Sequence, residues 1–261
     1  MLDSDVENVF RKLFDDVQKK DQFDQLRPLL AHYTAIQSVE RIIENSELWF
    51  GSPLFMNDHE EVRFGLLEGE RLLKSSPEIV KACGSPERAA RFFSEFDGFS
   101  RHYVGNHLGD TYVFCLSRHG PQDNDGRLSM WRGYGGNGNG AAIVFDTAQL
   151  NAIPTSALIV AKVEYGTHDE RRAAIGTFIT TFCEMLRVNE VTDDQLRIAA
   201  YWIYERIKLF ALFSKHIGFA EEEEWRVVYM RERDREKKLD EMFGYLVGPR
   251  DLPLSFSSTW S

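Results

Sequence analysis

Hydrophobic positions recur at helical spacing in AIQSVERIIENSE and in three longer stretches of the chain, and they form short strand-like runs elsewhere. Residues 3–20 carry apolar side chains three and four positions apart, which predicts a helix within the N-terminal segment 1–27. The longer stretches 60–108 and 168–216 show the same periodicity. The runs expected to form strands are LLAHYT, LWFGSP, TYVFCLS, AAIVFD, LIVAKVEYG, WRVVY and GYLVGP.

This order of elements predicts a single α+β domain over residues 1–261. Residues 60–108 and 168–216 are expected to be helical insertions between strands. We find neither an internal repeat nor a flexible linker. With 261 residues and 43% hydrophobic content, the chain has enough apolar material for one substantial core or two small ones.

Charge and cysteine content narrow the function classes. A net charge of −10 argues against broad, sequence-independent binding to nucleic acid, although it leaves a local basic groove open. Three cysteines without C-x-x-C spacing indicate neither a disulfide framework nor a zinc site. The charged start of the sequence does not read as a signal peptide, and no apolar run is long enough to span a membrane. We therefore expect a cytoplasmic protein that does not enter a membrane.

The stretch WRGYGGNGNGAAIVFD, residues 131–146, contains the pattern G-x-G-x-x-G. A dinucleotide-binding loop of this pattern follows a strand and opens a helix, because the pyrophosphate lies at the helix N-terminus. Here the predicted order is helix, glycines, strand. We therefore expect a tight turn that is no phosphate cradle but leaves the Tyr134 ring able to face a planar ligand.

Several polar residues are candidates for chemistry. His32 ends the first strand-like run and is, on spacing alone, more often a core histidine than a ligand. Asn57 and Asp58 first suggest a helix cap. In the segment EEEEWRVVY, alternation places Glu224 and Arg226 on one face, and Glu222 joins them if the strand starts early enough. An ion pair there would hold a carboxylate in place beside a developing cation.

At this point the sequence shows a resemblance. The segments from LAHYTAIQSVERIIENSELWFGSPLFMNDHEE to FAEEEEWRVVY, about residues 30–229, resemble the bacterial domain-of-unknown-function family 2971. The first segment is also similar to the opening of His-Tyr-Glu type ADP-ribosyltransferases. The resemblance implies a split mixed β-sheet of that type, with NAD as substrate.

The resemblance also implies roles for individual residues. His32 would bind a ribose hydroxyl of NAD beside Thr34, and Tyr134 would stack on the nicotinamide. Glu224 would hold the ribose 2′-hydroxyl and stabilise the oxocarbenium ion, with Glu222 upstream of it in an E-x-E pair. The remaining residues that would contribute to binding NAD are Tyr33, Ser52, Asn57, Trp131 and Arg226.

Three functions remain open on the sequence. The first is an NAD-dependent ADP-ribosyltransferase or NAD glycohydrolase, as an intracellular toxin or phage-defence effector. Its acceptor would be a protein, a nucleic acid or a small molecule, and an immunity or regulatory protein would be a partner. The second is a catalytically inactive nucleotide-sensing or binding module of the same fold. The third is a metal-dependent nuclease with Asp58, Glu61 and Glu222 as ligands.

Overall fold

The computed structural model describes residues 2–16, 23–53, 59–107, 110–150, 156–234, 236–237, 239 and 256–259. The chain divides into two compact units, each built from three separate stretches. Unit 1 comprises residues 1–20, 60–106 and 164–216, and unit 2 comprises residues 21–59, 107–163 and 217–261. The chain is of the α+β class, as expected. The three segments predicted to be helical supply unit 1, and one domain over the whole chain stays a prediction.

Unit 1 is mainly helical. Its helices are α1 (Asp3–Arg11), a 3-10 turn (Lys12–Phe14), α5 (His59–Ser75), α6 (Pro77–Cys83), α7 (Pro86–His102), which a π-helical turn (Tyr103–His107) follows, α9 (His168–Val188) and α10 (Leu196–Phe213). Ser85 caps α7 by accepting a hydrogen bond from the Arg88 N–H, and Pro86 occupies the first turn. Two short strands, β6 (Glu164–Gly166) and β7 (Ser214–His216), pair in parallel.

Aromatic rings form the centre of unit 1. Phe182 of α9 packs against Phe10 of α1 and Phe92 of α7, with ring centroids 5.3 and 5.5 Å apart. All three side chains are buried. Burial of such large apolar surfaces is the main source of stability for a helical unit of this kind. The core of unit 1 therefore joins helices from all three of its chain stretches.

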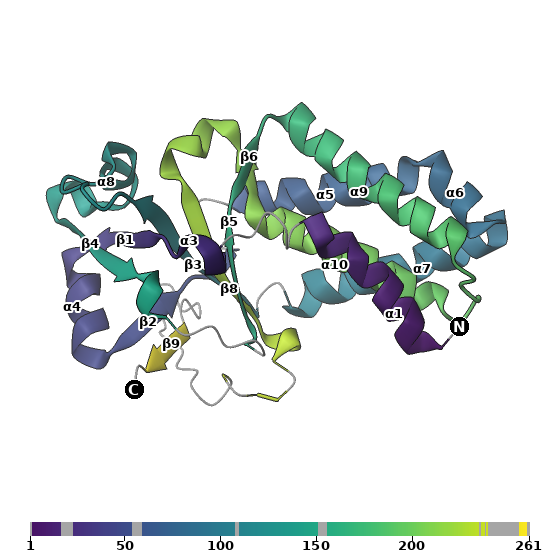
Figure 1. Ribbon diagram of the computed structural model, residues 1–261, viewed down its shortest axis with the longest axis horizontal. Helices are drawn as coiled ribbons and strands as arrows, with labels where there is room; N and C mark the ends of the chain where they lie inside the picture. The colour runs from purple at the N-terminus through teal and green to yellow at the C-terminus, as the bar shows by residue number, and fades with distance from the viewer. Residues whose placement is uncertain are drawn as a thin grey trace. The chain divides into compact units, whose positions relative to one another are not determined.

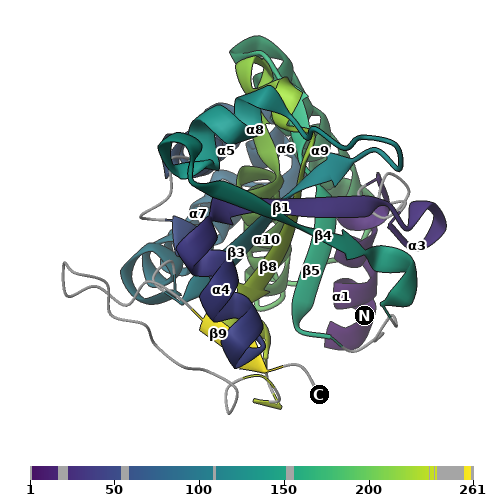
Figure 2. The same ribbon diagram turned by 90° about the vertical axis from the view of Figure 1, so that its left-hand side faces the viewer.

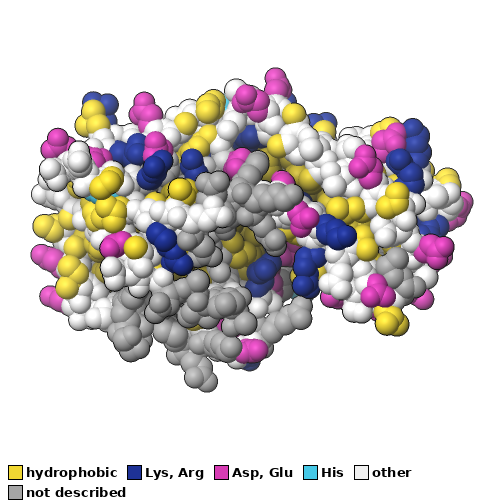
Figure 3. Space-filling view, in the orientation of Figure 1, with side chains coloured by type: hydrophobic (Ala, Val, Ile, Leu, Met, Phe, Trp, Pro, Cys, Tyr) yellow, Lys and Arg dark blue, Asp and Glu magenta, His cyan; other side chains and the backbone are white. Residues whose placement is uncertain are grey.

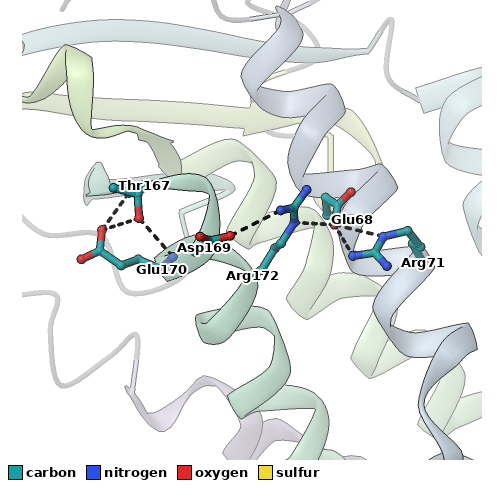
Figure 4. A network of polar contacts seen from close by, with 6 residues as sticks. All are labelled: Glu68, Arg71, Thr167, Asp169, Glu170 and Arg172. Atoms are coloured by element: carbon teal, nitrogen blue, oxygen red, sulfur yellow. Dashed lines mark hydrogen bonds and ion pairs between the residues drawn. The ribbon is translucent and has the colours of Figure 1, made fainter.

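A network of ion pairs joins α5 to the start of α9 (Figure 4). Glu68 accepts hydrogen bonds from Arg71, at 2.7 Å, and from Arg172, at 3.0 Å. Next to it, Thr167 and Glu170 cap the first turn of α9 reciprocally. The side chains of Thr167 and Glu170 accept hydrogen bonds from free backbone N–H groups of that turn. We therefore assign this region a structural role.

Unit 2 contains a five-stranded sheet in the order β4-β1-β3-β8-β5 (Figure 1). The strands are β1 (Leu29–Ala35), β3 (Thr111–His119), β4 (Gly140–Asp146), β5 (Leu158–Lys162) and β8 (Glu224–Met230). Every neighbouring pair is antiparallel. The expectation of a mixed sheet is therefore wrong for this sheet. Among the described residues, parallel pairing is found in the β6–β7 pair of unit 1.

The sheet opens between β1 and β3. These strands pair only over Leu29–Ala31 and Ser117–His119, although both continue further. Beyond the opening, Gly51 exchanges two backbone hydrogen bonds with Val113 of β3, at 2.8 and 2.9 Å. Strand β1 meanwhile stays paired with β4 along its whole length. The sheet is thus split at this point.

The remaining elements of unit 2 are α3 (Phe23–Leu26), α4 (Ile36–Asn45), β2 (Glu47–Phe50), α8 (Leu128–Tyr134), β9 (Phe256–Thr259) and 3-10 turns at Gly136–Gly138, Thr147–Gln149, Ile217–Glu222 and Arg231–Arg233. Strand β2 pairs with β9. The run LIVAKVEYG, expected to be one strand, forms the two strands β5 and β6. The expected strand GYLVGP lies outside the described residues.

The two faces of the sheet in unit 2 differ in character. One face, which we call the core face, carries Leu30, Phe114, Leu116, Trp225 and Tyr229, all buried in one cluster. The other, which we call the α8 face, carries Ala31 and Tyr33 packed against helix α8. Residues directly opposite each other in an antiparallel pair lie on the same face. Ser117 and Glu224 therefore belong with Ala31 on the α8 face.

In the part of the chain that the structure describes, no helix has both the length and the apolar character to cross a membrane.

Candidate functional site

A buried ion pair lies on the α8 face at the start of β8. Arg226 donates from Nε and Nη2 to the two carboxylate oxygens of Glu224, at 2.8 and 3.0 Å. Glu224 is 3% exposed and Arg226 is 1% exposed. Such a two-bond arrangement fixes the carboxylate in one orientation. The predicted alternation is thus confirmed, since Trp225 and Tyr229 pack in the core face instead.

Three aromatic side chains gather on the same face beside α8. The Tyr33 and Trp131 rings meet edge to face, with centroids 4.7 Å apart. Tyr134, one turn along α8, packs against the same buried cluster. Tyr33 is buried, whereas Trp131 and Tyr134 are half-buried. We call these three residues the aromatic group.

Arg127, which precedes α8, connects the aromatic group to the acidic segment 221–224. Its backbone N–H donates to the Tyr33 hydroxyl at 3.0 Å. Its guanidinium donates to the Glu223 carboxylate at 2.7 Å and to the Glu221 carbonyl at 3.2 Å. Sequence reasoning did not single out Arg127, because these partners lie more than ninety positions away and leave no local pattern.

The glycine segment has the predicted order. Helix α8 ends at Tyr134, the turn at residues 136–138 follows, and β4 begins at Gly140. The glycines allow a close approach of backbone, because a Cβ at Gly140 would lie 2.4 Å from the Gly135 Cα. A Cβ at Gly135 would lie 2.3 Å from the Trp131 carbonyl oxygen. These contacts explain Gly135 and Gly140 without a bound phosphate.

His32 lies on the core face, away from Glu224. Its ring stacks on Phe114 at 4.4 Å, and Nδ1 lies 2.9 Å from the Cys115 carbonyl oxygen. That carbonyl lies beyond the point at which β1 leaves β3. Burial lowers the pKa of His32, and the bond to Cys115 opposes this effect only in part. His32 and Glu224 therefore lie on opposite faces of the sheet, whereas the resemblance assigns both to one NAD molecule; their shared role stays a prediction.

The other predicted residues lie in different surroundings. Thr34 shares the core face with His32 by alternation, while Ser52 follows β2 and is buried. Glu222 ends a 3-10 turn, and Glu223 has a positive φ of 40° before β8 begins at Glu224. Strand β8 thus begins too late to include Glu222, so the condition under which Glu222 would share a strand face with Glu224 is not met. Asn57 and Asp58 lie outside the described residues.

The metal-site hypothesis named Asp58, Glu61 and Glu222 as ligands, and the surroundings of Glu61 do not support it. Glu61, in unit 1, accepts a 2.5 Å hydrogen bond from Arg171 and so has a structural partner. Within the described ranges, no group of three or more His, Cys, Asp or Glu side chains could hold a metal ion. Burial raises the pKa of both Cys83 and Cys183 to about 11, so these thiols are poor ligands and poor nucleophiles.

Comparison with known protein families gives a match over part of the chain. Residues 130–227 are similar to the family described as "Protein of unknown function (DUF2971)". This range holds Trp131, Tyr134, Glu224 and Arg226, whereas His32 and Tyr33 precede it. No curated protein and no solved structure matches the chain. The expected similarity to this family is confirmed for residues 130–227.

Proposed function

We propose that unit 2 is a binding module for NAD or a related nucleotide, with the ligand on the α8 face. The observation that carries this proposal is the aromatic group. Trp131 and Tyr134 are half-buried on α8 next to the glycine turn, and the Tyr33 ring meets that of Trp131 edge to face. A nicotinamide or adenine ring stacks favourably on such surfaces. The module would sense the nucleotide without turning it over.

Two features support the choice of a nucleotide over another planar ligand. The first is the resemblance of the segment around His32 to the opening of ADP-ribosyltransferases. The second is the split between β1 and β3, since a split sheet is the feature expected of that fold. The ADP-ribosyltransferase-type fold is part of this proposal, and a shared fold alone does not imply a shared reaction.

Transfer of ADP-ribose from NAD is the second candidate, and the geometry of Glu224 favours it. A carboxylate that a guanidinium holds in a low-dielectric site suits the stabilisation of an oxocarbenium ion. As an effector or toxin, the protein would pass ADP-ribose to an acceptor or to water. Two observations place this function second: Glu224 is 3% exposed, and His32 lies on the other face. NAD would reach Glu224 only if that side chain became more exposed than it is here.

One experiment addresses both candidates. Titration calorimetry with NAD, ADP-ribose and nicotinamide measures binding, and chromatography of the same samples measures released nicotinamide. We expect binding without release, and Trp131→Ala should weaken it about tenfold because stacking contributes about 1–3 kcal/mol. Tyr134→Phe keeps the ring and serves as the matched control, with affinity close to that of the unchanged protein.

The outcomes separate the candidates. Nicotinamide release that Glu224→Gln abolishes would favour transfer over sensing, because this change keeps the shape of the side chain and removes its charge. If none of the three ligands binds at millimolar concentration, both candidates fail.

A further inference from the structure

The outer edge of the sheet in unit 2 carries an unusual strand. Strand β4 ends the order β4-β1-β3-β8-β5, and among the described residues its ladder partner is β1 alone. Figure 1 draws it at the left-hand edge of the sheet, and Figure 2 turns this edge toward the viewer. An edge strand presents a row of backbone N–H and C=O groups to any chain that can pair with them.

The sequence of β4 lacks the residues that usually block such pairing. The strand reads GAAIVFD and has no Lys, no Pro and no charge before Asp146. Its residues are half-buried or exposed throughout, and Val144 is 45% exposed. The opposite edge, β5, is shorter and ends at Lys162, a charge of the kind that discourages pairing.

We propose that β4 pairs antiparallel with β4 of a second copy of this chain, forming a two-fold dimer with a continuous sheet. Centred on Ile143, the strand is complementary to itself. Each Ala141 stands opposite Phe145, each Ala142 opposite Val144, and Ile143 opposite its own copy. Small side chains thus meet large ones, which suits cross-strand packing.

The charges along β4 also favour a second copy of this chain as the partner. In this register the carboxylate of Asp146 stands opposite Gly140, so the two copies bring no like charges face to face. The pairing also covers Val144, which lies with Ala142 on the α8 face. A two-fold contact of this kind closes on itself, because each copy uses its single β4 edge. The inference concerns assembly and is independent of the proposed nucleotide site.

Sedimentation of the full chain from about 1 to 100 μM tests the proposal. We expect a dimer that dissociates on dilution. Val144→Lys should raise its dissociation constant at least about tenfold, because the pair would have to bury a lysine stem and charge. Val188→Lys is the matched control, since Val188 in unit 1 is 77% exposed and not on this edge. A thermal melt of each variant confirms that it folds.

Oxidative cross-linking tests the register. Ile143→Cys places two thiols directly opposite each other, whereas Val144→Cys places them two residues out of register, beyond disulfide reach. We expect a disulfide-linked dimer for Ile143→Cys alone. A monomer at all concentrations would overturn the proposal. So would a dimer that Val144→Lys leaves intact, or a mass that keeps growing with concentration.

Discussion

At the scale of single residues, His32 is an uncharged histidine with a structural role on the core face of the sheet. The Cys115 carbonyl can only accept a hydrogen bond, so the His32 Nδ1 carries the proton and donates it. Phe114 covers one face of the imidazole. Burial of the ring disfavours its charged form, and this is the main cause of its lowered pKa. His32 therefore ties β1 to β3 where the two strands separate.

This role predicts a dependence of stability on pH. The folded pKa of His32 lies below the usual value of about 6.5, so the unfolded chain binds the proton more readily. The contribution of His32 is present above pH of about 6.5 and is lost as the pH falls toward the folded pKa. The loss is at most about 1.4 kcal/mol per pH unit. Denaturant unfolding between pH 7.5 and 5.5 should show a shallower slope for His32→Gln.

The control for this prediction is His102→Gln, because His102 is an exposed residue of α7. It should leave the slope as in the unchanged protein. An unaltered slope in His32→Gln would show that other groups cause the loss of stability.

Sequence reasoning reaches some residues of the site and misses others for a physical reason. Glu224 and Arg226 are two positions apart on one strand, so local alternation was enough to predict their ion pair. The face that His32 occupies depends on the pairing of β1 with β3, whose partners lie more than eighty positions apart. Arg127 likewise acts through distant partners. The contacts of a residue can be predicted from the sequence when its partners are close in the sequence. They cannot be predicted in this way when they depend on how distant strands pair.

At the scale of elements, two glycines of α5 allow a close contact with α10. A Cβ at Gly65 would lie 2.6 Å from the Ala211 Cα, and one at Gly69 would lie 2.5 Å from the Ile207 Cγ2. Both distances are too short for real atoms, so any side chain there would push the helices apart. The close helix contact explains why α5 tolerates two residues of poor helix propensity.

We expect Gly65→Ala to lower the free energy of unfolding by about 1–3 kcal/mol, the usual cost of overpacking. Gly69→Ala should cost less, because a side-chain methyl moves more easily than a backbone atom. Gly98→Ala in α7 is the matched control, since nothing lies within 4 Å of its added Cβ. It should raise stability by about 0.5–1 kcal/mol. Urea unfolding measures all three, and a neutral Gly65→Ala would contradict the close contact.

Of the three scales, the helices and strands were the most predictable from the sequence. Helical periodicity over 60–108 and 168–216 predicted the regions in which α5, α6, α7, α9 and α10 form, because an apolar stripe must face a core. The boundaries were less predictable. LIVAKVEYG breaks into two strands that belong to different units, and β8 begins at Glu224, directly after the positive φ of Glu223. Local pattern does not encode such breaks.

At the scale of the whole molecule, the net charge and the individual ion pairs have opposite effects on the stability of the folded state. The chain has 41 acidic and 31 basic residues, so at neutral pH it repels itself to some degree. Acidic and basic side chains are nevertheless interspersed on the face drawn in Figure 3. Mild acid reduces the net repulsion but also protonates carboxylates that are paired in the folded state. Which effect dominates depends on how far their pKa values are lowered.

Glu68 is the carboxylate on which we test this balance. Its hydrogen bond from Arg71, with a further contribution from Arg172, holds the pKa of Glu68 below its usual value. Its contribution to stability is therefore present above the unfolded pKa and is lost as the pH falls through the folded pKa. The side chain is 16% exposed, but its partners are 55% and 41% exposed, so solvent screens both pairs.

We expect Glu68→Gln to lower the free energy of unfolding at pH 7 by about 1 kcal/mol, the sum of two weak pairs. At pH 3 the difference should shrink, because the contribution of the charge is lost as the pH falls from the unfolded pKa toward the lowered folded pKa. Glu60→Gln, on the same helix at a side chain 77% exposed, should cost less than half as much at pH 7. Urea unfolding at both pH values measures the effect. An equal cost at pH 7 and pH 3 would mean that packing, and not charge, is what Glu68 contributes.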